Sequence, residues 1–286
     1  MTTALRDQLS YLQRNRGRAG LPRGRRGTTA GGARVSLDPD LSGPPPGPCG
    51  TPTALDLRLA ATEQGELLVW EKSISAVWSQ AGQVTQSLWA ALDGAGAGAS
   101  SATELEPLSR VDPTRVGWVD IETAGFIGRP VFLVGLMRPV DGELVITQLL
   151  ARDYSQERAL LAACAALVAE LEVLVTFNGK CFDLPFLRDR MAYHRLAGEL
   201  EVEAVDLLWA ARRRWRGRVP DCRLQTLERH LCRRLRAGDI PGAEIPQRYH
   251  DFVRSREAGL IAPVMRHNRL DLLTMAELSA LLLGEP

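Results

Sequence analysis

The sequence predicts a mixed α/β sheet with helices packed on its faces. Apolar runs of strand length occur at 116–121, 131–137 and 144–150, and a short buried run follows at 173–177. After the third run, strand patterns alternate with longer helical patterns, which indicates a sheet flanked by helices. The chain of 286 residues shows no internal repeat and is long enough for one good-sized core.

The first 53 residues have the composition of a basic leader. One short helix is expected at 4–14, but from about Arg16 the chain is dominated by Arg, Gly and Pro and ends in the run Gly43-Pro44-Pro45-Pro46-Gly47-Pro48. Such a segment cannot bury enough apolar surface to offset the entropy lost on ordering. We therefore predict that residues 1–53 are disordered.

A small region is expected between this leader and the main sheet, over residues 54–112. Residues 54–61 and 66–73 alternate around Glu63-Gln64-Gly65, which is typical of a β-hairpin. A short helix near 84–92 and a flexible linker of Gly, Ala and Ser at 94–101 complete this region.

The predicted main domain spans residues 113–286. Asp141-Gly142 supplies the turn between its second and third strands, and Pro185 suits the first turn of a helix. A brief strand is expected at 202–205, and helices are expected at 155–171, 185–193, 206–215, 222–236, 244–256 and 263–283.

Composition narrows the class of protein. The five cysteines form no CxxC pair and no zinc-type spacing with the four histidines, which favours reduced thiols in a cytoplasmic protein. The N-terminus has no signal-peptide pattern, and the longest apolar stretch, 160–169, is too short to span a bilayer. We expect an intracellular, cytoplasmic protein that does not contact a membrane.

Acidic residues stand where two predicted strands end. Asp120 and Glu122 close the strand at 116–121, and side chains two residues apart project from the same side of a strand. Asp183 lies in the loop that follows the strand at 173–177. Because ligands of open α/β sheets collect beyond the carboxyl ends of the strands, all three carboxylates are expected to face one crevice.

The last predicted helix adds a histidine and a fourth acid. His267 and Asp271 are four residues apart, so they share one face of that helix. Pro263 fits a helix start and would place this pair in the early turns.

Carboxylates gathered in one crevice indicate a metal site. Without cations they would repel each other, and Mg²⁺ with its preference for oxygen ligands removes that penalty. Two such ions about 3.5–4 Å apart would stabilise the attacking and the leaving oxygen of an in-line displacement at phosphorus. His267, with an ordinary pKa of roughly 6.5, could accept the proton of the attacking water.

Each of these residues also has an ordinary structural explanation. Asp120 and Glu122 could mark the entry to a loop, Asp183 could cap the helix at 185–193, and His267 could be a packed histidine. Their occurrence together, in this order, favours the metal site.

The acidic segments resemble those of the YprB-type ribonuclease H-like domain, a branch of the DnaQ-like (DEDD) exonuclease superfamily. The resemblance extends from about residue 113 to the C-terminus. Its matching stretches are Val119-Asp120-Ile121-Glu122-Thr123, Val175-Thr176-Phe177-Asn178-Gly179-Lys180-Cys181-Phe182-Asp183-Leu184-Pro185 and His267-Asn268-Arg269-Leu270-Asp271. Two further stretches, 222–228 and Asp239-Ile240-Pro241-Gly242 with Ile245-Pro246 and Tyr249, are similar to this branch in particular.

The resemblance implies an RNase H-like fold and 3′–5′ exonuclease chemistry with two Mg²⁺ or Mn²⁺ ions. It implies that Asp120, Glu122, Asp183 and Asp271 bind the metals and that His267 is the base. This sequence departs from the superfamily in two places. His267 precedes Asp271 by four residues, the spacing of the tyrosine-bearing class, whereas the histidine-bearing class usually has five. Ala124 replaces the second threonine often found in the first motif.

A basic run supplies the predicted contact to nucleic acid. The stretch 211–236 holds ten arginines against two acids. Guanidinium groups suit phosphate oxygens, and a tryptophan can stack on an unpaired base. The alternative is a solvated helix face with one tryptophan in the core. The predicted contacts are Arg212, Arg213, Arg214, Trp215 and Arg216, together with Asn178 and Lys180 of the second motif.

These features, with the 3′–5′ exonuclease chemistry that the resemblance implies, predict a metal-dependent 3′–5′ exonuclease that acts on single-stranded DNA or RNA. An endonuclease, which would also cut circular single strands, is one alternative. A nucleic-acid-binding module with an idle site is the other. The sequence gives no indication of protein partners.

Overall fold

The computed structural model describes residues 55–94, 103–126, 128–196 and 200–284. These belong to one compact unit, Leu37–Pro286, and the remaining unit, Met1–Ser36, lies outside them. The leader predicted for 1–53, with its helix at 4–14, also falls outside the described residues, as does all but the first residue of the predicted linker at 94–101.

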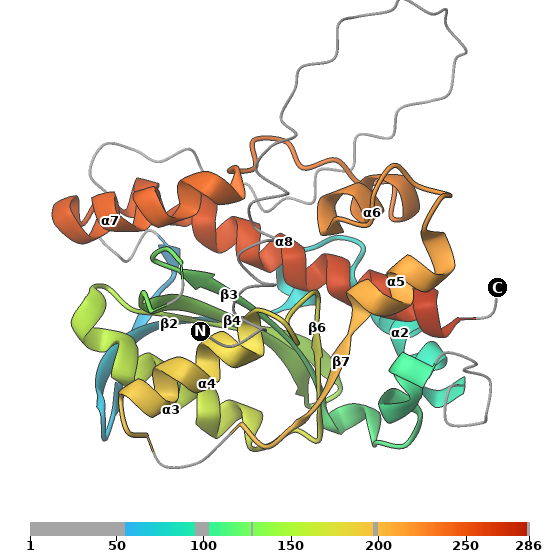
Figure 1. Ribbon diagram of the computed structural model, residues 1–286, viewed down its shortest axis with the longest axis horizontal. Helices are drawn as coiled ribbons and strands as arrows, with labels where there is room; N and C mark the ends of the chain where they lie inside the picture. Colours follow the sequence, from blue (N-terminus) through green and yellow to red (C-terminus); the bar gives the residue numbers. More distant parts are fainter. Residues whose placement is uncertain (1–54, 95–102, 127, 197–199, 285–286) are drawn as a thin grey trace, which may run out of the picture. The chain divides into compact units, whose positions relative to one another are not determined.

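Seven strands form one mixed sheet in the order β1-β2-β5-β4-β3-β6-β7 (Figure 1). Neighbours from β1 to β3 are antiparallel, and β6 and β7 continue the sheet parallel to β3. This confirms the predicted mixed sheet. The strands are β1 (Arg58–Thr62), β2 (Gly65–Ser73), β3 (Val116–Thr123), β4 (Val131–Val140), β5 (Glu143–Leu150), β6 (Val173–Thr176) and β7 (Glu203–Asp206).

The expected N-terminal hairpin is present and belongs to this same sheet. β1 and β2 meet at the Thr62–Gly65 pair, and β2 pairs with β5 from Leu68 opposite Leu150 to Ser73 opposite Val145. Residues 67–70 of β2 are all buried, as in a strand covered on both faces. The hairpin and the segment with the acidic motifs therefore share one core.

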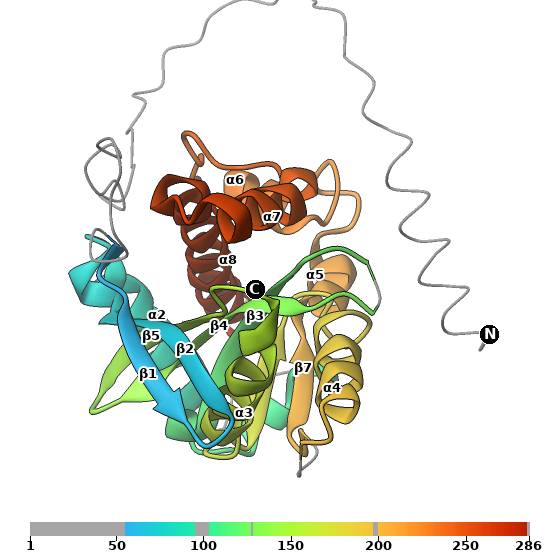
Figure 2. The same cartoon turned by 90° about the vertical axis from the view of Figure 1, so that its left-hand side faces the viewer.

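Helices lie against both faces of the sheet (Figures 1 and 2). Side-chain alternation along β3 separates the two faces: Trp118 donates its Nε1–H to Ser279 Oγ of the last helix at 2.9 Å, whereas Gly117 faces Leu171 beyond α3. None of the described helices is long and apolar enough to cross a membrane. The α-helices are α2 (Ala81–Gly94), α3 (Glu157–Val168), α4 (Asp183–Tyr193), α5 (Leu207–Trp215), α6 (Leu224–Leu231), α7 (Ile245–Ser255) and α8 (Ala258–Leu283), and the short 3₁₀ helices are η2 (Ile74–Ala76), η4 (Thr103–Ser109), η5 (Pro113–Arg115), η6 (Tyr154–Gln156) and η7 (Gly242–Glu244).

Helix α6 is shorter than predicted. It ends at Leu231, and the chain turns at Arg233, whose φ of 53° lies in the left-handed region. Arg234 and Arg236 then point back to Glu228, each with its Nε 2.5 Å from a carboxylate oxygen. The free energy gained by pairing the buried Glu228 with two arginines exceeds what a longer helix would contribute.

Helix α8 begins earlier than predicted. It starts at Ala258, so Pro263 lies inside the helix rather than at its start. Proline lacks an N–H and disturbs a helix interior, but buried Ala258 and Ile261 anchor the turn before it. His267 and Asp271 are therefore in the middle of α8, and the expectation that they lie in its early turns was wrong.

Candidate active site

Asp120 and Glu122 are partly buried side chains of β3, and Asp120 faces α8. Asn268 of α8 donates its Nδ2–H to Asp120 Oδ2 at 2.7 Å and to the Asp120 carbonyl oxygen at 3.0 Å. Opposite Asp120 in the sheet is Gly135, where a Cβ would lie 2.1 Å from Asn268 Oδ1. Only glycine at this position lets α8 approach closely enough to hold Asp120.

A second amide fixes the orientation of Asn268. Gln148 of β5 donates its Nε2–H to Asn268 Oδ1 at 2.7 Å and to the Met265 carbonyl at 2.8 Å. Its own Oε1 accepts from Arg269 Nη1 at 2.8 Å. Both amides are completely buried, so breaking their hydrogen bond would be costly. Asn268 therefore holds the Asp120 carboxylate in a fixed position.

Asp183 is the first residue of α4 and is only 6% exposed. Its Oδ1 accepts the backbone N–H of Ile121 at 3.2 Å, which ties α4 to β3 between the two acidic residues of that strand. Phe182 occupies the N-cap position. Asp183 is therefore not the N-cap of this helix, which was the structural alternative considered for it.

The loop that carries Asp183 is held by a further acid, Asp206. The Asp206 carboxylate accepts the backbone N–H groups of Asn178 at 2.7 Å, Lys180 at 3.2 Å and Leu208 at 3.1 Å. It thus caps α5, as expected for an aspartate before a helix, and closes the loop. Asn178 has a φ of 66°, a left-handed turn conformation that asparagine tolerates.

His267 and Asp271 belong to a charged network that contains two residues to which the sequence assigned no role. His267 Nδ1 lies 3.0 Å from both carboxylate oxygens of Asp239, and its Nε2 lies 3.4 Å from Asp271 Oδ2. Arg236 places Nη2 2.6 Å from Asp271 Oδ1 and Nη1 3.2 Å from Asp239 Oδ2. Asp239 belongs to one of the stretches similar to the YprB branch, and that similarity was the available signal for it.

Burial and neighbouring carboxylates raise the pKa values of Asp120, Glu122 and Asp183. Burial, followed by the charges of Asp271, Glu122 and Asp183, holds the pKa of Asp120 well above its usual value. Burial likewise raises the pKa of Glu122 to about 8 and that of Asp183 to about 7, with the charge of Asp271 contributing to both. The four acids from β3, α4 and α8 therefore form one electrostatic cluster.

The charge of His267 follows from this cluster. Burial alone would lower its pKa, but the hydrogen bond to Asp239 and the charges of Asp271 and Glu122 outweigh burial and raise the pKa to about 9. With this pKa, His267 is a cation at neutral pH when no metal ion is bound.

The donor set suits a hard divalent cation, because it consists of carboxylate oxygens with an excess of negative charge. Within the ranges that the structure describes, however, no three His, Cys, Asp or Glu side chains already stand close enough to hold a metal ion. Their hydrogen-bond and ion-pair partners explain why: Asp120 is turned to Asn268, and Asp271 is paired with Arg236. A bound cation would compete with these partners and would relieve the repulsion that raises the pKa values.

These pKa values predict that the protein loses stability with rising pH when a chelator is present. Asp183 and Glu122 keep protons in the folded state that the unfolded chain releases near its ordinary values of 3.8 and 4.5, so folding is penalised progressively as pH rises through about 7 and 8. The contribution of His267 has the same sign, present below 6.5 and lost through about 9. Thermal unfolding in chelator should therefore show a falling midpoint between about pH 5 and pH 9, and Mn²⁺ should flatten the fall. A midpoint that rises over this range would contradict the prediction.

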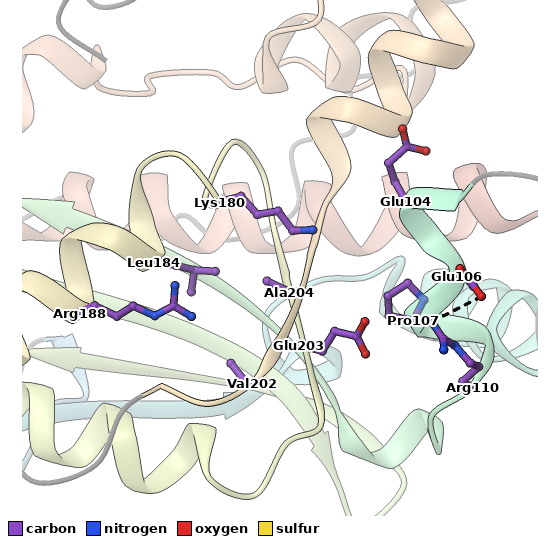
Figure 3. Close-up of a pocket in the computed structure, with 10 residues that line it drawn as sticks. All are labelled: Glu104, Glu106, Pro107, Arg110, Lys180, Leu184, Arg188, Val202, Glu203 and Ala204. Atoms are coloured by element: carbon purple, nitrogen blue, oxygen red, sulfur yellow. Dashed lines mark ion pairs between the residues drawn. The ribbon is translucent and has the colours of Figure 1, made fainter. Parts of the chain in front are cut away.

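An open cavity of about 550 Å³ lies beside the Asn178–Asp183 loop, but none of the four acids lines it (Figure 3). Lys180 and Arg188 point into it from α4 and its preceding loop, across from Glu203 of β7 and Glu106 of η4. Its lining is of mixed charge, so it does not resemble an anion site. Lys180 is exposed in this cavity, on the loop that leads to Asp183.

The structure separates the members of the predicted basic run. Arg213 forms an ion pair with Glu104 of η4. Arg214 donates to the carbonyls of Leu281 at 2.5 Å and Leu282 at 3.3 Å, and so caps the C-terminal end of α8. Trp215 is 8% exposed, which is the packed alternative, so its ring cannot stack on a base.

The family assignment follows from the sequence of this same region. The family described as RNase_H superfamily matches residues 118–283, which is more than half of the chain and includes most of β3 and all of α4 and α8. The chain belongs to the RNase H superfamily. The assignment agrees with the observed mixed sheet, and the predicted RNase H-like fold is confirmed.

One curated relative is similar to part of this chain. The chain is 32% identical over 164 residues to "Uncharacterized protein YprB" of Bacillus subtilis (strain 168), a match that covers 56% of this chain and 40% of the relative. The chain thus spans less than half the length of that relative.

One solved structure is similar at a lower level. It is the family B DNA polymerase from the hyperthermophilic archaeon Pyrobaculum calidifontis, with 19% identity, a TM-score of 0.47, and coverage of 58% of this chain and 24% of the polymerase. A likeness of this size adds nothing to the functional argument.

Proposed function

We propose that this RNase H superfamily protein is a metal-dependent 3′–5′ exonuclease that hydrolyses the terminal phosphodiester of single-stranded DNA or RNA. The observation that supports it most is the electrostatic cluster of Asp120, Glu122, Asp183 and Asp271, drawn from three remote segments. Such a cluster costs free energy in an apo protein, and a divalent cation would offset that cost. The direction of digestion rests on the resemblance of the motifs to DEDD exonucleases.

In this proposal the four carboxylates hold two Mg²⁺ or Mn²⁺ ions. The ions, when bound, neutralise charge on the phosphate and activate water. Asn268 keeps Asp120 in place, and Arg236 anchors Asp271 on the side away from His267 Nε2. Lys180, exposed on the loop that carries Asp183, would contact a phosphate of the substrate.

His267 would accept the proton of the attacking water at Nε2, because Nδ1–H is occupied by Asp239. The hydrogen bond to Asp239 and the charges of Asp271 and Glu122 raise its pKa, so neutralising the last two by cations would lower that pKa toward the range of a general base. Asp239 would thus act as a positioning residue that fixes the tautomer and the orientation of the His267 ring.

Digestion of end-labelled oligonucleotides tests this function. With Mn²⁺ or Mg²⁺, a 5′-labelled single strand should shorten stepwise to a ladder, and a chelator should stop the reaction. A circular single strand should stay intact. Cleavage of the circle would instead indicate an endonuclease, and binding without turnover under either cation would indicate a binding module.

A further inference from the structure

Helix α5 has one buried face and one face with an aromatic and basic character. Leu208, Ala211 and Trp215 are buried against the core, whereas Trp209 is 49% exposed. Positions 209, 212 and 213 of α5 and its C-cap residue Arg216 are spaced by three, one and three residues, so they follow a single side of the helix. That side carries Trp209 and three arginines, and the tryptophan in question is not the one that the sequence suggested.

Two of the cations on this face are available for a ligand. Arg213 is paired with Glu104, and in the described part of the chain no carboxylate forms an ion pair with Arg212 or Arg216. The guanidinium of Arg212 lies 5.9 Å from the centre of the Trp209 ring. A positive charge therefore lies next to an exposed aromatic ring.

This face is fixed to the loop that carries Asp183. Asp206, the N-cap of α5, accepts backbone N–H groups from Asn178 and Lys180 on that loop and from Leu208 on the helix. Trp209 is the next residue along the helix. A single strand of nucleic acid with its end at the acidic cluster would pass over this loop to reach Trp209.

We propose that Trp209, Arg212 and Arg216 form a binding surface for single-stranded nucleic acid. Trp209 stacks on an unpaired base, and the two arginines contact the neighbouring phosphates. The surface favours single strands because the faces of paired bases inside a duplex are already covered by stacking. The path of the strand from the acidic cluster to this surface rests on the proposed nuclease function, whereas the binding itself does not.

Fluorescence anisotropy of a labelled oligothymidylate in chelator tests the surface without any cleavage. Trp209→Ala should weaken binding about tenfold, since stacking on one aromatic side chain has an effect of this order, and Trp209→Phe should retain most of the affinity. The double variant Arg212→Ala with Arg216→Ala should lower the salt dependence of log Kd by a slope of about two. Tyr193→Ala, which removes a more exposed aromatic ring from α4, is the matched control and should bind as the wild type.

The outcomes separate this surface from the proposed enzyme. If Trp209→Ala weakens binding while no oligonucleotide is ever cut, the surface stands and the nuclease proposal fails. If oligonucleotides are cut but Trp209→Ala and the arginine variant bind as the wild type, with thermal unfolding unchanged, the surface is overturned. An equal loss of affinity for a blunt duplex would also overturn the stacking role of Trp209.

Discussion

Replacing Asp183 with asparagine is expected to abolish phosphodiester cleavage and, at the same time, to raise the thermal stability of the protein in chelator. The variant keeps the size of the side chain and the acceptor for the Ile121 N–H. It removes one charge from a cluster in which burial already holds the Asp183 pKa at about 7. The proposed metal ligand and the source of the electrostatic cost are thus the same carboxylate, and both effects follow from its removal.

The loss of activity should be about a thousandfold or more, because charge stabilisation through a bound metal contributes several kcal/mol to the transition state. Initial rates on a labelled oligonucleotide with Mn²⁺ measure it, and differential scanning fluorimetry at about pH 8 in chelator measures the gain in stability. Asp189→Asn, an exposed acid on the same helix α4, is the control and should change neither quantity. Undiminished cleavage by Asp183→Asn would refute its assignment as a metal ligand.

Replacing Asp239 with asparagine should reduce kcat about a hundredfold with little change in KM, the lower range of what a positioned proton acceptor contributes. Asparagine can turn its amide nitrogen toward His267 and thereby favour the wrong tautomer of the ring, and it loses the ion pair with Arg236. The oligonucleotide assay over a range of substrate concentrations separates kcat from KM.

A double variant distinguishes positioning from a general loss of structure. If Asp239 acts through His267, then Asp239→Asn in the background of His267→Ala should cost little more than His267→Ala alone. Fully additive losses would contradict this role. Asp251→Asn, an acid of α7 paired with Arg254, serves as the control for removal of a charge outside the network.

Strands and turns were predictable because their causes lie close together in the chain. The apolar runs at 131–137 and 144–150 became β4 and β5, joined by Asp141 and Gly142, both of which adopt positive φ as the turn requires. The cap of α5 by Asp206 is equally local. Helix ends were less predictable where a buried ion pair intervened, as the pairing of Glu228 with Arg234 and Arg236 does at the end of α6.

The partners of the acidic residues could not be read from the chain in the same way. Asn268 was visible inside the third motif, but its hold on Asp120 depends on Gly135 being opposite that residue in the sheet. Asp239 was noted only for its similarity to one branch, and its contact with His267 spans 28 residues. Trp209 and Trp215 lie on the same short helix, and only packing against the core shows which ring is exposed.

Residue type and local spacing were therefore enough to predict the mixed sheet and the turn between β4 and β5, and to single out the four acids and the histidine that the structure brings into one network. Hydrophobic periodicity and turn-forming residues depend on only a few neighbouring positions, so they can be recognised in the sequence without knowledge of the tertiary structure. Other features depended on which surfaces meet when the chain folds. These are the pairing of β1 and β2 with that sheet, the contacts of Arg236 and Asp239 with Asp271 and His267, and the exposure of the Trp209 ring. Those contacts arise from burial and charge pairing between segments far apart in sequence, and no local pattern encodes them.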